Sequence, residues 1–451
     1  MYGRRGIMNS VLSRLKLSSL QLIIAGFLIV ILTGTLLLML PVSSKAGVWT
    51  SFGDALFTSV SAVCVTGLVI TDTASFWSAF GQAVILVLIQ IGGLSIVLVT
   101  AFFATISGKK ISLLQRSMLQ DSISSHQIGG VVKMTSFIFK TALLIEACGI
   151  LLMLPSFCKE YGVSGIWMSV FHSVSAFCNA GFDIMGTRTG AFTSLTAFGG
   201  RIGIVLPVCF MIVSGGIGFF TWKDIVTHKL RVKKYHMQSK VILVTTAVLI
   251  LLPTLFLFFR EYSLFPAKER ICLSLFQAVT PRTAGFNTAD LTALTGISRI
   301  LLIILMLIGG SPGSTAGGIK TTTLAVLCKN SLAVIRQRKS TQLFGRRITD
   351  DTIKVAATLL MLYLFLTFTG AFIISMTESL PVESCLFETA SAIGTVGLSL
   401  GITPLLGPVS RFILLVLMFF GRVGGLTLLY AAISSKDAEV SRRPVEKITV
   451  G

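Results

Sequence analysis

The sequence predicts an all-α integral membrane protein whose helices form four similar units around one central pore. Three observations support this fold class. Only 12% of the residues are charged, whereas a water-soluble protein of this size has roughly 25% charged residues. Eight apolar stretches are long enough to span a bilayer, and four shorter apolar stretches lie between the members of successive pairs. The four short stretches share one sequence pattern.

The first apolar stretch, residues 20–42, is predicted to be a retained membrane helix. Basic residues precede it, as they do in a secretory signal peptide. It is longer than the roughly 7–15 apolar residues of a signal peptide and long enough for the about 20 residues that cross a bilayer. Seven further stretches of spanning length follow, at residues 80–106, 131–154, 197–220, 241–259, 300–327, 355–376 and 412–433.

The four shorter stretches are too short to cross the membrane and are predicted to be re-entrant. They lie at residues 51–65, 165–177, 271–280 and 381–393. Irregular backbone at membrane depth is tolerated only where protein buries it or where it lines a water-filled cavity. We therefore predict four helix–re-entrant loop–helix repeats, at 20–107, 127–228, 240–328 and 353–433, with an N-terminal arm at 1–19 and a C-terminal tail at 434–451.

The distribution of basic residues predicts the orientation in the membrane. Lys and Arg gather in the N-terminal arm, in the connections 108–133, 223–240 and 329–354, and in the C-terminal tail. By the positive-inside rule, both termini of this multi-pass protein face the cytoplasm from the inner (plasma) membrane, and the re-entrant loops enter from outside. The formal net charge of +20 does not indicate nucleic acid binding, because the basic residues lie between apolar runs rather than on one soluble face.

The shared pattern in the short stretches is an aromatic residue, then small hydroxylated residues, then a glycine. Phe57, Phe171, Phe276 and Phe387 begin the four copies, and each is followed nine or ten residues later by glycine. The glycines are Gly67, Gly181, Gly285 and Gly397, separated by 104 to 114 residues. Self-similarity at such a period indicates an internal four-fold repeat.

The loops around these glycines are predicted to form a selectivity filter for a monovalent cation. A ring of backbone carbonyls can replace the water around an ion, and glycine can adopt the left-handed backbone that turns carbonyls toward one axis. No Asp or Glu occurs within the tetrapeptides 65–68, 179–182, 283–286 and 395–398, where a ring of carboxylates would be more typical of a pore for divalent cations. The alternative is that the glycines only allow close helix packing, and their matched positions in four loops argue against it. The predicted filter residues are Val65, Thr66, Gly67, Asn179, Ala180, Gly181, Thr283, Ala284, Gly285, Thr395, Val396 and Gly397.

These residues resemble the Trk/Ktr/HKT superfamily of potassium transporters, most closely the bacterial Ktr-type ion-translocating subunit. The most specific segments are QAVTPRTAGFN at 277–287, GGSPGSTAGGIK at 309–320, LIQIGG at 88–93 and GRVGG at 421–425. The resemblance implies eight membrane helices and four re-entrant loops in a potassium-channel-like monomer that pairs as a homodimer. Relatives that favour sodium commonly have serine where this chain has Gly67. We therefore expect K⁺ transport, with a sodium-selective or sodium-coupled relative as the alternative.

A glycine-rich segment interrupts the second helix of the third repeat. Residues 309–318 contain five glycines and Pro312, and relative to Ala each Gly costs a helix about 1 kcal/mol and each Pro about 3 kcal/mol. One interpretation is a simple kink in this helix. The family resemblance implies instead an intramembrane gate beneath the filter, which would comprise Gly309, Gly310, Ser311, Gly313, Ser314, Thr315, Gly317, Gly318 and Lys320.

Arg422 is a lone charge in an otherwise apolar helix. A charge buried in the membrane is costly unless it is paired or hydrated, so it is a candidate functional residue. The resemblance implies that Arg422 lies in the cation pathway below the filter and acts as an electrostatic barrier. The alternative is a structural ion pair, for example with Glu388. Arg282, inside the third re-entrant stretch, is expected to brace the filter loop.

A polytopic membrane enzyme is the rival class of protein. Ser311 and Ser314 are the candidate nucleophiles, but no His or Lys–Asp partner occurs in a matching context, and no cluster of metal ligands occurs. We therefore expect no enzyme activity and no organic cofactor, with K⁺ as the transported ion and Na⁺ as the alternative. The chain has no Rossmann-like domain, so the resemblance implies a separate cytoplasmic nucleotide-binding (RCK-type) regulatory ring.

Overall fold

The computed structural model describes residues 18–107, 113–122, 131–425 and 428. This part of the chain is helical apart from loops and one small hairpin, in which β1 (Gln342–Leu343) pairs with antiparallel β2 (Arg346–Arg347). The predicted all-α fold class is confirmed. The predictions for the tail at 434–451 and for most of the N-terminal arm lie outside the described residues.

A long helix, a short helix and a further apolar helix recur in this order in four repeats. The first repeat contains α2 (Ser19–Met39), α3 (Phe52–Val63), α4 (Thr73–Phe76), α5 (Ala79–Leu94) and α6 (Ile96–Ile106), and α7 (Leu113–Ser122) follows it. The second contains α8 (Val131–Tyr161), α9 (Ser164–Phe177), α10 (Gly186–Thr189), α11 (Ile202–Gly216) and α12 (Phe219–His228). The third contains α13 (Met237–Arg260), α14 (Ala267–Val279), α15 (Gly296–Leu307) and α16 (Thr321–Ile335). The fourth contains α17 (Asp350–Glu378), α18 (Val382–Gly394) and α19 (Pro408–Val423).

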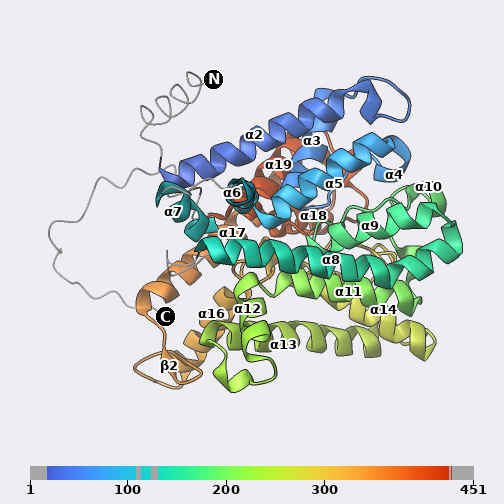
Figure 1. Ribbon diagram of the computed structural model, residues 1–451. Helices are drawn as coiled ribbons and strands as arrows, with labels where there is room; N and C mark the ends of the chain where they lie inside the picture. Colours follow the sequence, from blue (N-terminus) through green and yellow to red (C-terminus); the bar gives the residue numbers. More distant parts are fainter. Residues whose placement is uncertain (1–17, 108–112, 123–130, 426–427, 429–451) are drawn as a thin grey trace, which may run out of the picture.

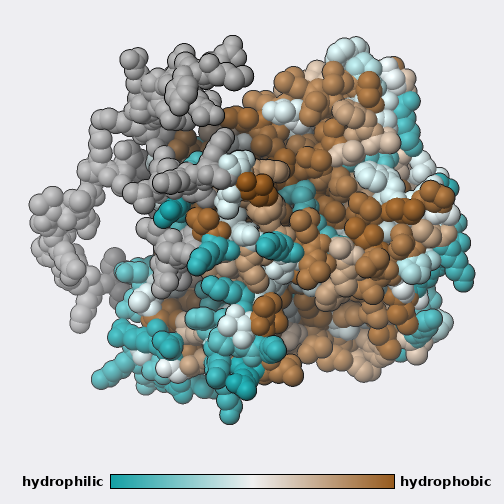
Figure 2. All heavy atoms as spheres, in the orientation of Figure 1, coloured by the Kyte–Doolittle hydropathy of each residue, from teal (hydrophilic) through white to brown (hydrophobic). Residues whose placement is uncertain are grey.

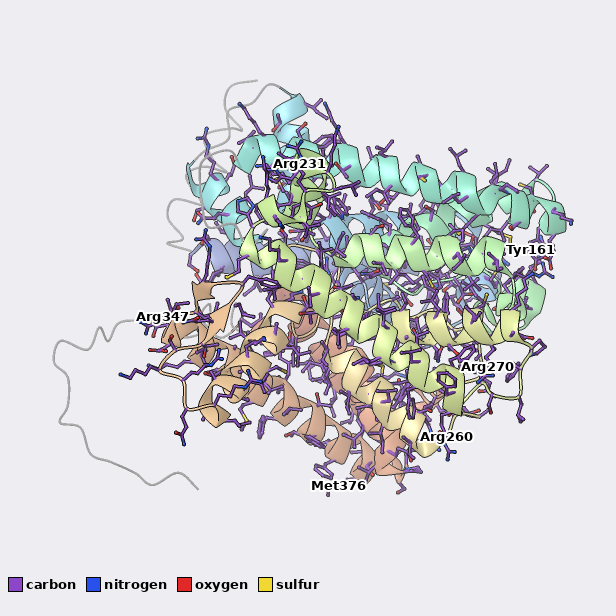
Figure 3. All side chains as sticks on the ribbon, turned by 90° about the horizontal axis from the view of Figure 1, so that it is seen from below. Tyr161, Arg231, Arg260, Arg270, Arg347 and Met376 are labelled. Carbon is purple, nitrogen blue, oxygen red and sulfur yellow. The ribbon has the colours of Figure 1, made fainter. Side chains whose placement is uncertain are left out.

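The first helix of each repeat is long and apolar enough to cross a membrane. These four helices are α2, α8, α13 and α17, and only about a third of the residues in their most apolar windows are buried inside the molecule. Three of them, α2, α8 and α13, run in nearly the same direction along the bundle (Figure 1). The visible surface has a broad hydrophobic band between hydrophilic regions at the lower left and along the right edge (Figure 2). Arg231 and Arg347 lie at one end of the molecule, opposite Tyr161, Arg260 and Arg270 (Figure 3).

Two predicted spans differ from the expectation because the helix is broken within the apolar run. The stretch 80–106 forms α5 and α6, which meet at 93°, and the stretch 197–220 forms α11 and α12, which meet at 100°. The breaks occur at Ser95 and Gly218, whose φ angles are +74° and +89°. A positive φ lies outside the right-handed helical region, so the chain must change direction there.

The other two repeats are interrupted at the corresponding place. In the fourth repeat, α19 ends at Val423 and Gly424 has a φ of +95°. In the third, a loop at 308–320, which contains the glycine-rich segment 309–318, separates α15 from α16. The four breaks therefore recur at one level of the bundle, although their form differs.

A glycine in the second helix of three repeats allows close packing against the preceding short helix. A Cβ atom on Gly92 would lie 2.1 Å from the carbonyl oxygen of Val63, at the end of α3. The equivalent distance is 2.0 Å both for Gly215 against Phe177 at the end of α9 and for Gly421 against Ile393 in α18. Any side chain would clash with the backbone here, so glycine sets how closely these helices approach.

Candidate ion pathway

The four loops predicted to form the filter meet in one ring. A Cβ atom on Gly67 would lie 3.1 Å from the Cα of Gly181, and one on Gly181 would lie 3.0 Å from the Cα of Gly285. The equivalent distances are 3.2 Å from Gly285 to Gly397 and 3.0 Å from Gly397 back to Gly67. The four glycines are therefore successive neighbours around a common axis, although they come from four separate repeats.

The backbone of the four loops is left-handed at two matched positions. The third residue of each is the glycine, with φ of +86° at Gly67, +68° at Gly181, +79° at Gly285 and +93° at Gly397. The first residue also has a positive φ, and these residues are Val65, Asn179, Thr283 and Thr395. Left-handed backbone costs an L-residue other than glycine roughly 1–2 kcal/mol. Strain repeated at one position in four loops is typical of a functional site.

A hydroxyl group from the short helix braces each loop. Ser61 Oγ accepts a hydrogen bond from the backbone N–H of Gly67 at 3.1 Å, and Ser391 Oγ accepts one from Gly397 at 3.0 Å. In the other two loops the hydroxyl donates: Ser175 Oγ to the carbonyl of Phe182 and Thr280 Oγ1 to that of Phe286, both at 2.7 Å. Each of these hydroxyl-bearing residues lies four positions after the aromatic residue of the repeated pattern. The sequence pattern showed these hydroxyls, but reasoning from it assigned them no role.

Replacing Ser61 with alanine should destabilise the first loop. The buried N–H of Gly67 would lose its acceptor, which costs about 1–3 kcal/mol. The thermal unfolding midpoint of the purified protein in detergent measures the effect. Thr33→Ala provides the matched control, because the Thr33 hydroxyl is exposed and bonds only to the carbonyl of Ile29 in its own helix. A Ser61→Ala midpoint no lower than that of the control would contradict the bracing role.

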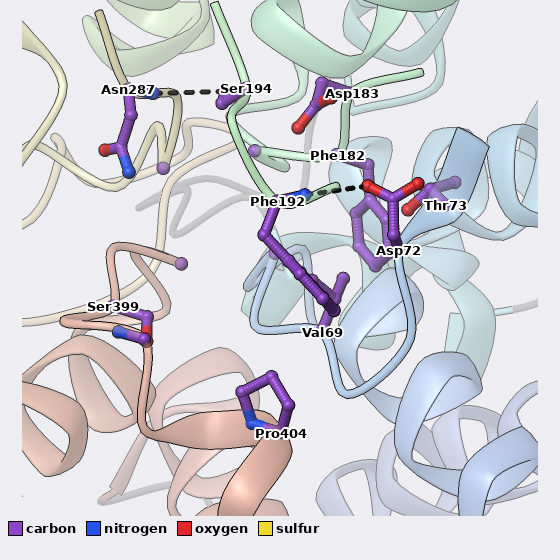
Figure 4. A pocket seen from close by; sticks show the side chains of 15 residues that line it. Val69, Asp72, Thr73, Phe182, Asp183, Phe192, Ser194, Asn287, Ser399 and Pro404 are labelled. Carbon is purple, nitrogen blue, oxygen red and sulfur yellow. Dashed lines mark hydrogen bonds between the residues drawn. The ribbon is translucent and has the colours of Figure 1, made fainter. Parts of the chain in front are cut away.

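A cavity of about 160 Å³ opens on one side of the glycine ring (Figure 4). Asp72 lines it and accepts hydrogen bonds from the backbone N–H groups of Ser75 at 2.8 Å and Phe192 at 3.0 Å, which ties the first repeat to the second. Similarly, the N–H of Asn287 donates to Ser194 Oγ at 3.2 Å and ties the third repeat to the second. The mouth of the ring is thus held by bonds between repeats.

The glycine-rich loop of the third repeat lies on the other side of the ring. Its two ends are joined by hydrogen bonds from Gly309 N to the carbonyl of Ile319 at 2.9 Å and from Thr321 N to that of Gly310 at 3.0 Å. A Cβ atom on Gly317 would lie 2.1 Å from Oγ1 of Thr395, a predicted filter residue. The glycine-rich loop is therefore packed directly against the ring of four loops.

The second repeat holds the tip of this loop. The backbone N–H of Ser311 donates to the carbonyl of Gly216 at 2.9 Å, next to the break between α11 and α12. Thr315 donates twice: its N–H to the carbonyl of Gly215 at 3.3 Å and its Oγ1 to that of Phe177 at 3.0 Å. These few hydrogen bonds hold the glycine-rich loop in one position.

Arg422 contacts the same loop. Its guanidinium donates to the carbonyls of Thr315 in the loop, of Gly92 at 2.5 Å and of Gly93 at 2.9 Å. The alternative ion pair with Glu388 does not form, because that carboxylate accepts hydrogen bonds from Ser399, Leu400 and Thr403.

Half-buried Lys320 and buried Arg282 have polar partners that the sequence did not reveal. Lys320 Nζ donates to the carbonyls of Ala316 at 2.8 Å and Gly317 at 3.3 Å, within the loop itself. Arg282 donates to Thr246 Oγ1 on α13 at 3.3 Å. Its side chain therefore contacts the adjacent helix, and the expected brace on the filter loop stays a prediction.

This arrangement defines a multi-spanning membrane protein built from four repeats around a ring of re-entrant loops. The sequence matches the model of the TrkH family, described as cation transport protein, over residues 17–442. The chain belongs to this family, whose members are cation transporters and not enzymes.

Three relatives illustrate the match. The chain is 40% identical to the potassium/sodium uptake protein NtpJ of Enterococcus hirae, with 97% of this chain and 98% of that protein covered. It is 35% identical to the Ktr system potassium uptake protein B of Bacillus subtilis, with 98% and 99% covered. The crystal structure of the potassium transporter TrkH from Vibrio parahaemolyticus matches with a TM-score of 0.69 and 19% identity, over 90% of this chain and 84% of that one. The last comparison supports the fold.

Proposed function

We propose that this protein is the pore-forming membrane subunit of a K⁺ uptake system and conducts K⁺ through the ring of four loops. The observation that carries the proposal is the closed ring of Gly67, Gly181, Gly285 and Gly397, with left-handed backbone at matched positions in all four loops. Carbonyl groups turned toward one axis replace the hydration shell of a monovalent cation. The relatives named as potassium uptake proteins support K⁺ as that cation.

Growth of a bacterium that lacks K⁺ uptake tests this function. Expression of the chain should restore growth at low external K⁺, and purified protein in vesicles should mediate uptake of a K⁺ tracer. A protein that is inserted in the membrane but restores neither growth nor tracer uptake would overturn the proposal. Because the relative from Enterococcus hirae is named for both potassium and sodium, sodium is the second candidate ion. K⁺ uptake that requires Na⁺, or Na⁺ uptake that is faster than K⁺ uptake, would favour this alternative.

We further infer that the loop at 309–318, together with Lys320, is the gate. Bonds to the carbonyls of Gly215, Gly216 and Phe177 hold it against the filter. We expect the loop to exchange between a position that covers the pore and one that does not. A separate cytoplasmic ring of nucleotide-binding (RCK-type) subunits would control this exchange by binding more tightly to the protein with the loop in one of the two positions. The helix α16 leads from the loop to the basic hairpin of β1 and β2, which offers a route for this control.

The proposed assembly is a homodimer with both termini in the cytoplasm. Arg231 and Arg347, on connections rich in basic residues, lie at the same end of the molecule (Figure 3). That end is cytoplasmic by the positive-inside rule. A cysteine placed at Ser340 in this end, in a protein whose eight native cysteines are replaced by serine, should react with a membrane-impermeant thiol reagent only in inside-out vesicles.

Arg422 is proposed to limit the flux of K⁺. It lies beneath the filter and holds the carbonyl of Thr315 in the gate loop. Arg422→Gln removes a positive charge from the pathway and weakens the attachment of the loop, and both effects should raise the maximal K⁺ flux. Flux into vesicles is the measurement, and Arg422→Lys, which keeps the charge, is the control. A folded and inserted Arg422→Gln protein with lower flux than the unmodified protein would show that the residue is structural.

A further inference from the structure

A second and larger cavity lies below the gate loop. Its volume is about 320 Å³, and it is lined by residues from all four repeats. We call it the inner cavity and define it by Lys320 and Arg422 together with Ile23 and Phe27 of α2 and Leu359 and Tyr363 of α17. Its polar end lies beside the gate loop, and its apolar walls belong to two of the helices long enough to cross the membrane.

The inner cavity contains two basic side chains without an acidic partner. No Asp or Glu lines it among the described residues, and neither Lys320 nor Arg422 forms an ion pair with a described carboxylate. All five of their hydrogen bonds go to backbone carbonyls. An ammonium group has three N–H donors and a guanidinium has five, so donors remain on both side chains.

A third donor lies on the wall of the cavity. Tyr363 is 3% exposed, and its hydroxyl makes no hydrogen bond to another described residue. Its ring packs edge-on against Phe420 of α19 with centroids 5.9 Å apart, and Phe27 packs edge-on against Phe419 at 6.5 Å. These two contacts place α2 and α17 on either side of α19, the helix that carries Arg422.

We propose that the inner cavity binds the phosphate group of an anionic membrane phospholipid. A phosphodiester carries one negative charge and acceptor oxygens, which suit the spare donors of Lys320, Arg422 and Tyr363. Basic pockets between membrane helices on the cytoplasmic side are a general type of lipid headgroup site. The lipid is favoured over free phosphate because Ile23, Phe27 and Leu359 form an apolar wall suited to an acyl chain.

The bound phosphate would promote conduction by reducing the positive potential beneath the filter. Two cations beside the gate loop repel a K⁺ ion that passes it, and this repulsion is strong where water is scarce. An anion between them lowers that barrier. This consequence rests on the proposed function, whereas occupation of the cavity by lipid does not.

Flux measurements in vesicles of two compositions test the effect on transport. K⁺ flux should be roughly three- to tenfold higher in vesicles that contain phosphatidylglycerol than in vesicles of phosphatidylcholine alone. Lys320→Gln should conduct better than the unmodified protein in the neutral vesicles and should respond little to the anionic lipid. Lys339→Gln removes an exposed charge from the loop before β1 and should keep the full response. Measuring at high choline chloride removes the effect of general surface charge, since the screening length falls to about 3 Å at 1 M salt.

Retention of lipid tests the site independently of transport. Phosphatidylglycerol should remain with the purified protein and should be lost from the Lys320→Gln and Ile23→Trp variants. The larger side chain of the second variant would occupy the space beside the apolar wall. Equal retention in these variants and the unmodified protein would overturn the proposal. If inorganic phosphate alone raised the K⁺ flux into vesicles of phosphatidylcholine, the lipid would be rejected as the source of the bound phosphate. Carbodiimide crosslinking of Lys320 to a carboxylate of this chain would identify the occupant as protein.

The two proposals fail in distinguishable ways. Selective retention of phosphatidylglycerol without K⁺ flux in any vesicle would leave the lipid site and reject the K⁺ pore. K⁺ flux that does not depend on phosphatidylglycerol, together with no selective retention, would leave the pore and reject the lipid site.

Discussion

Deleting residues 311–316 should give a pore that passes K⁺ continuously and ignores the regulatory subunit. The deletion removes the bonds of Ser311 and Thr315 to the second repeat and the bond of Arg422 to the loop. The residues on either side of the deletion are close, because a Cβ atom on Gly309 would lie 3.0 Å from the carbonyl carbon of Gly317. The shortened loop can therefore join without moving α15 or α16, and it loses the residues that bond to the second repeat, leaving only its glycine ends beside the ring.

Flux into vesicles with and without the cytoplasmic partner and its nucleotide measures this result. Thr315→Val is the matched control, since it removes only the bond to Phe177 and keeps the length of the loop. We expect the control to retain regulation with a raised basal flux. If the deleted protein stays closed until the partner and nucleotide are added, the loop is not the gate.

Gly67→Ser should greatly reduce the preference for K⁺ over Na⁺. Gly67 has a φ of +86°, and a Cβ atom there would lie 2.4 Å from the carbonyl oxygen of Ala180, a predicted filter residue of the neighbouring loop. The carbonyl must shift or the loop must open, and either change alters one side of the ring. Relative uptake of K⁺ and Na⁺ tracers by vesicles is the measurement.

Gly401→Ser separates a change in the ring from general backbone strain. Gly401 has nearly the same φ, +87°, and lies beside the mouth of the ring, but a Cβ atom there would have no neighbour within 4 Å. We expect this control to lose some stability and to keep its ion preference. Equal ion preference in the Gly67→Ser protein and the unmodified protein would count against the filter assignment.

The membrane class and the four-fold repeat could be predicted because both depend on local sequence. A spanning helix needs only a sufficient run of apolar residues, whatever it packs against. The recurrence of an aromatic residue, a hydroxyl and a glycine identifies equivalent positions such as Gly67 and Gly397 without knowledge of their contacts. The interruption at 309–318 was predicted for the same reason, because its glycines and proline disfavour a helix by themselves.

The breaks at Ser95 and Gly218 were missed because hydropathy does not record backbone direction. Serine gives no local signal for a φ of +74°, and the cost of this angle is met by contacts that the chain makes elsewhere. The left-handed backbone at Val65 and Thr283 was missed in the same way. Neither residue favours this conformation, so only the surrounding loops and short helices impose it.

By itself, the sequence determined that the protein is a helical membrane protein, that four re-entrant loops carry its pattern, and which glycines they contain. Tertiary structure decided that these loops close into one ring and that Arg422 bonds to Gly92 and Thr315 instead of pairing with Glu388. It also brought Lys320 and Tyr363 to one cavity. The physical reason is separation along the chain: apolar runs and glycine positions act locally, whereas Arg422 and Gly92 are 330 residues apart and meet only when the four repeats assemble.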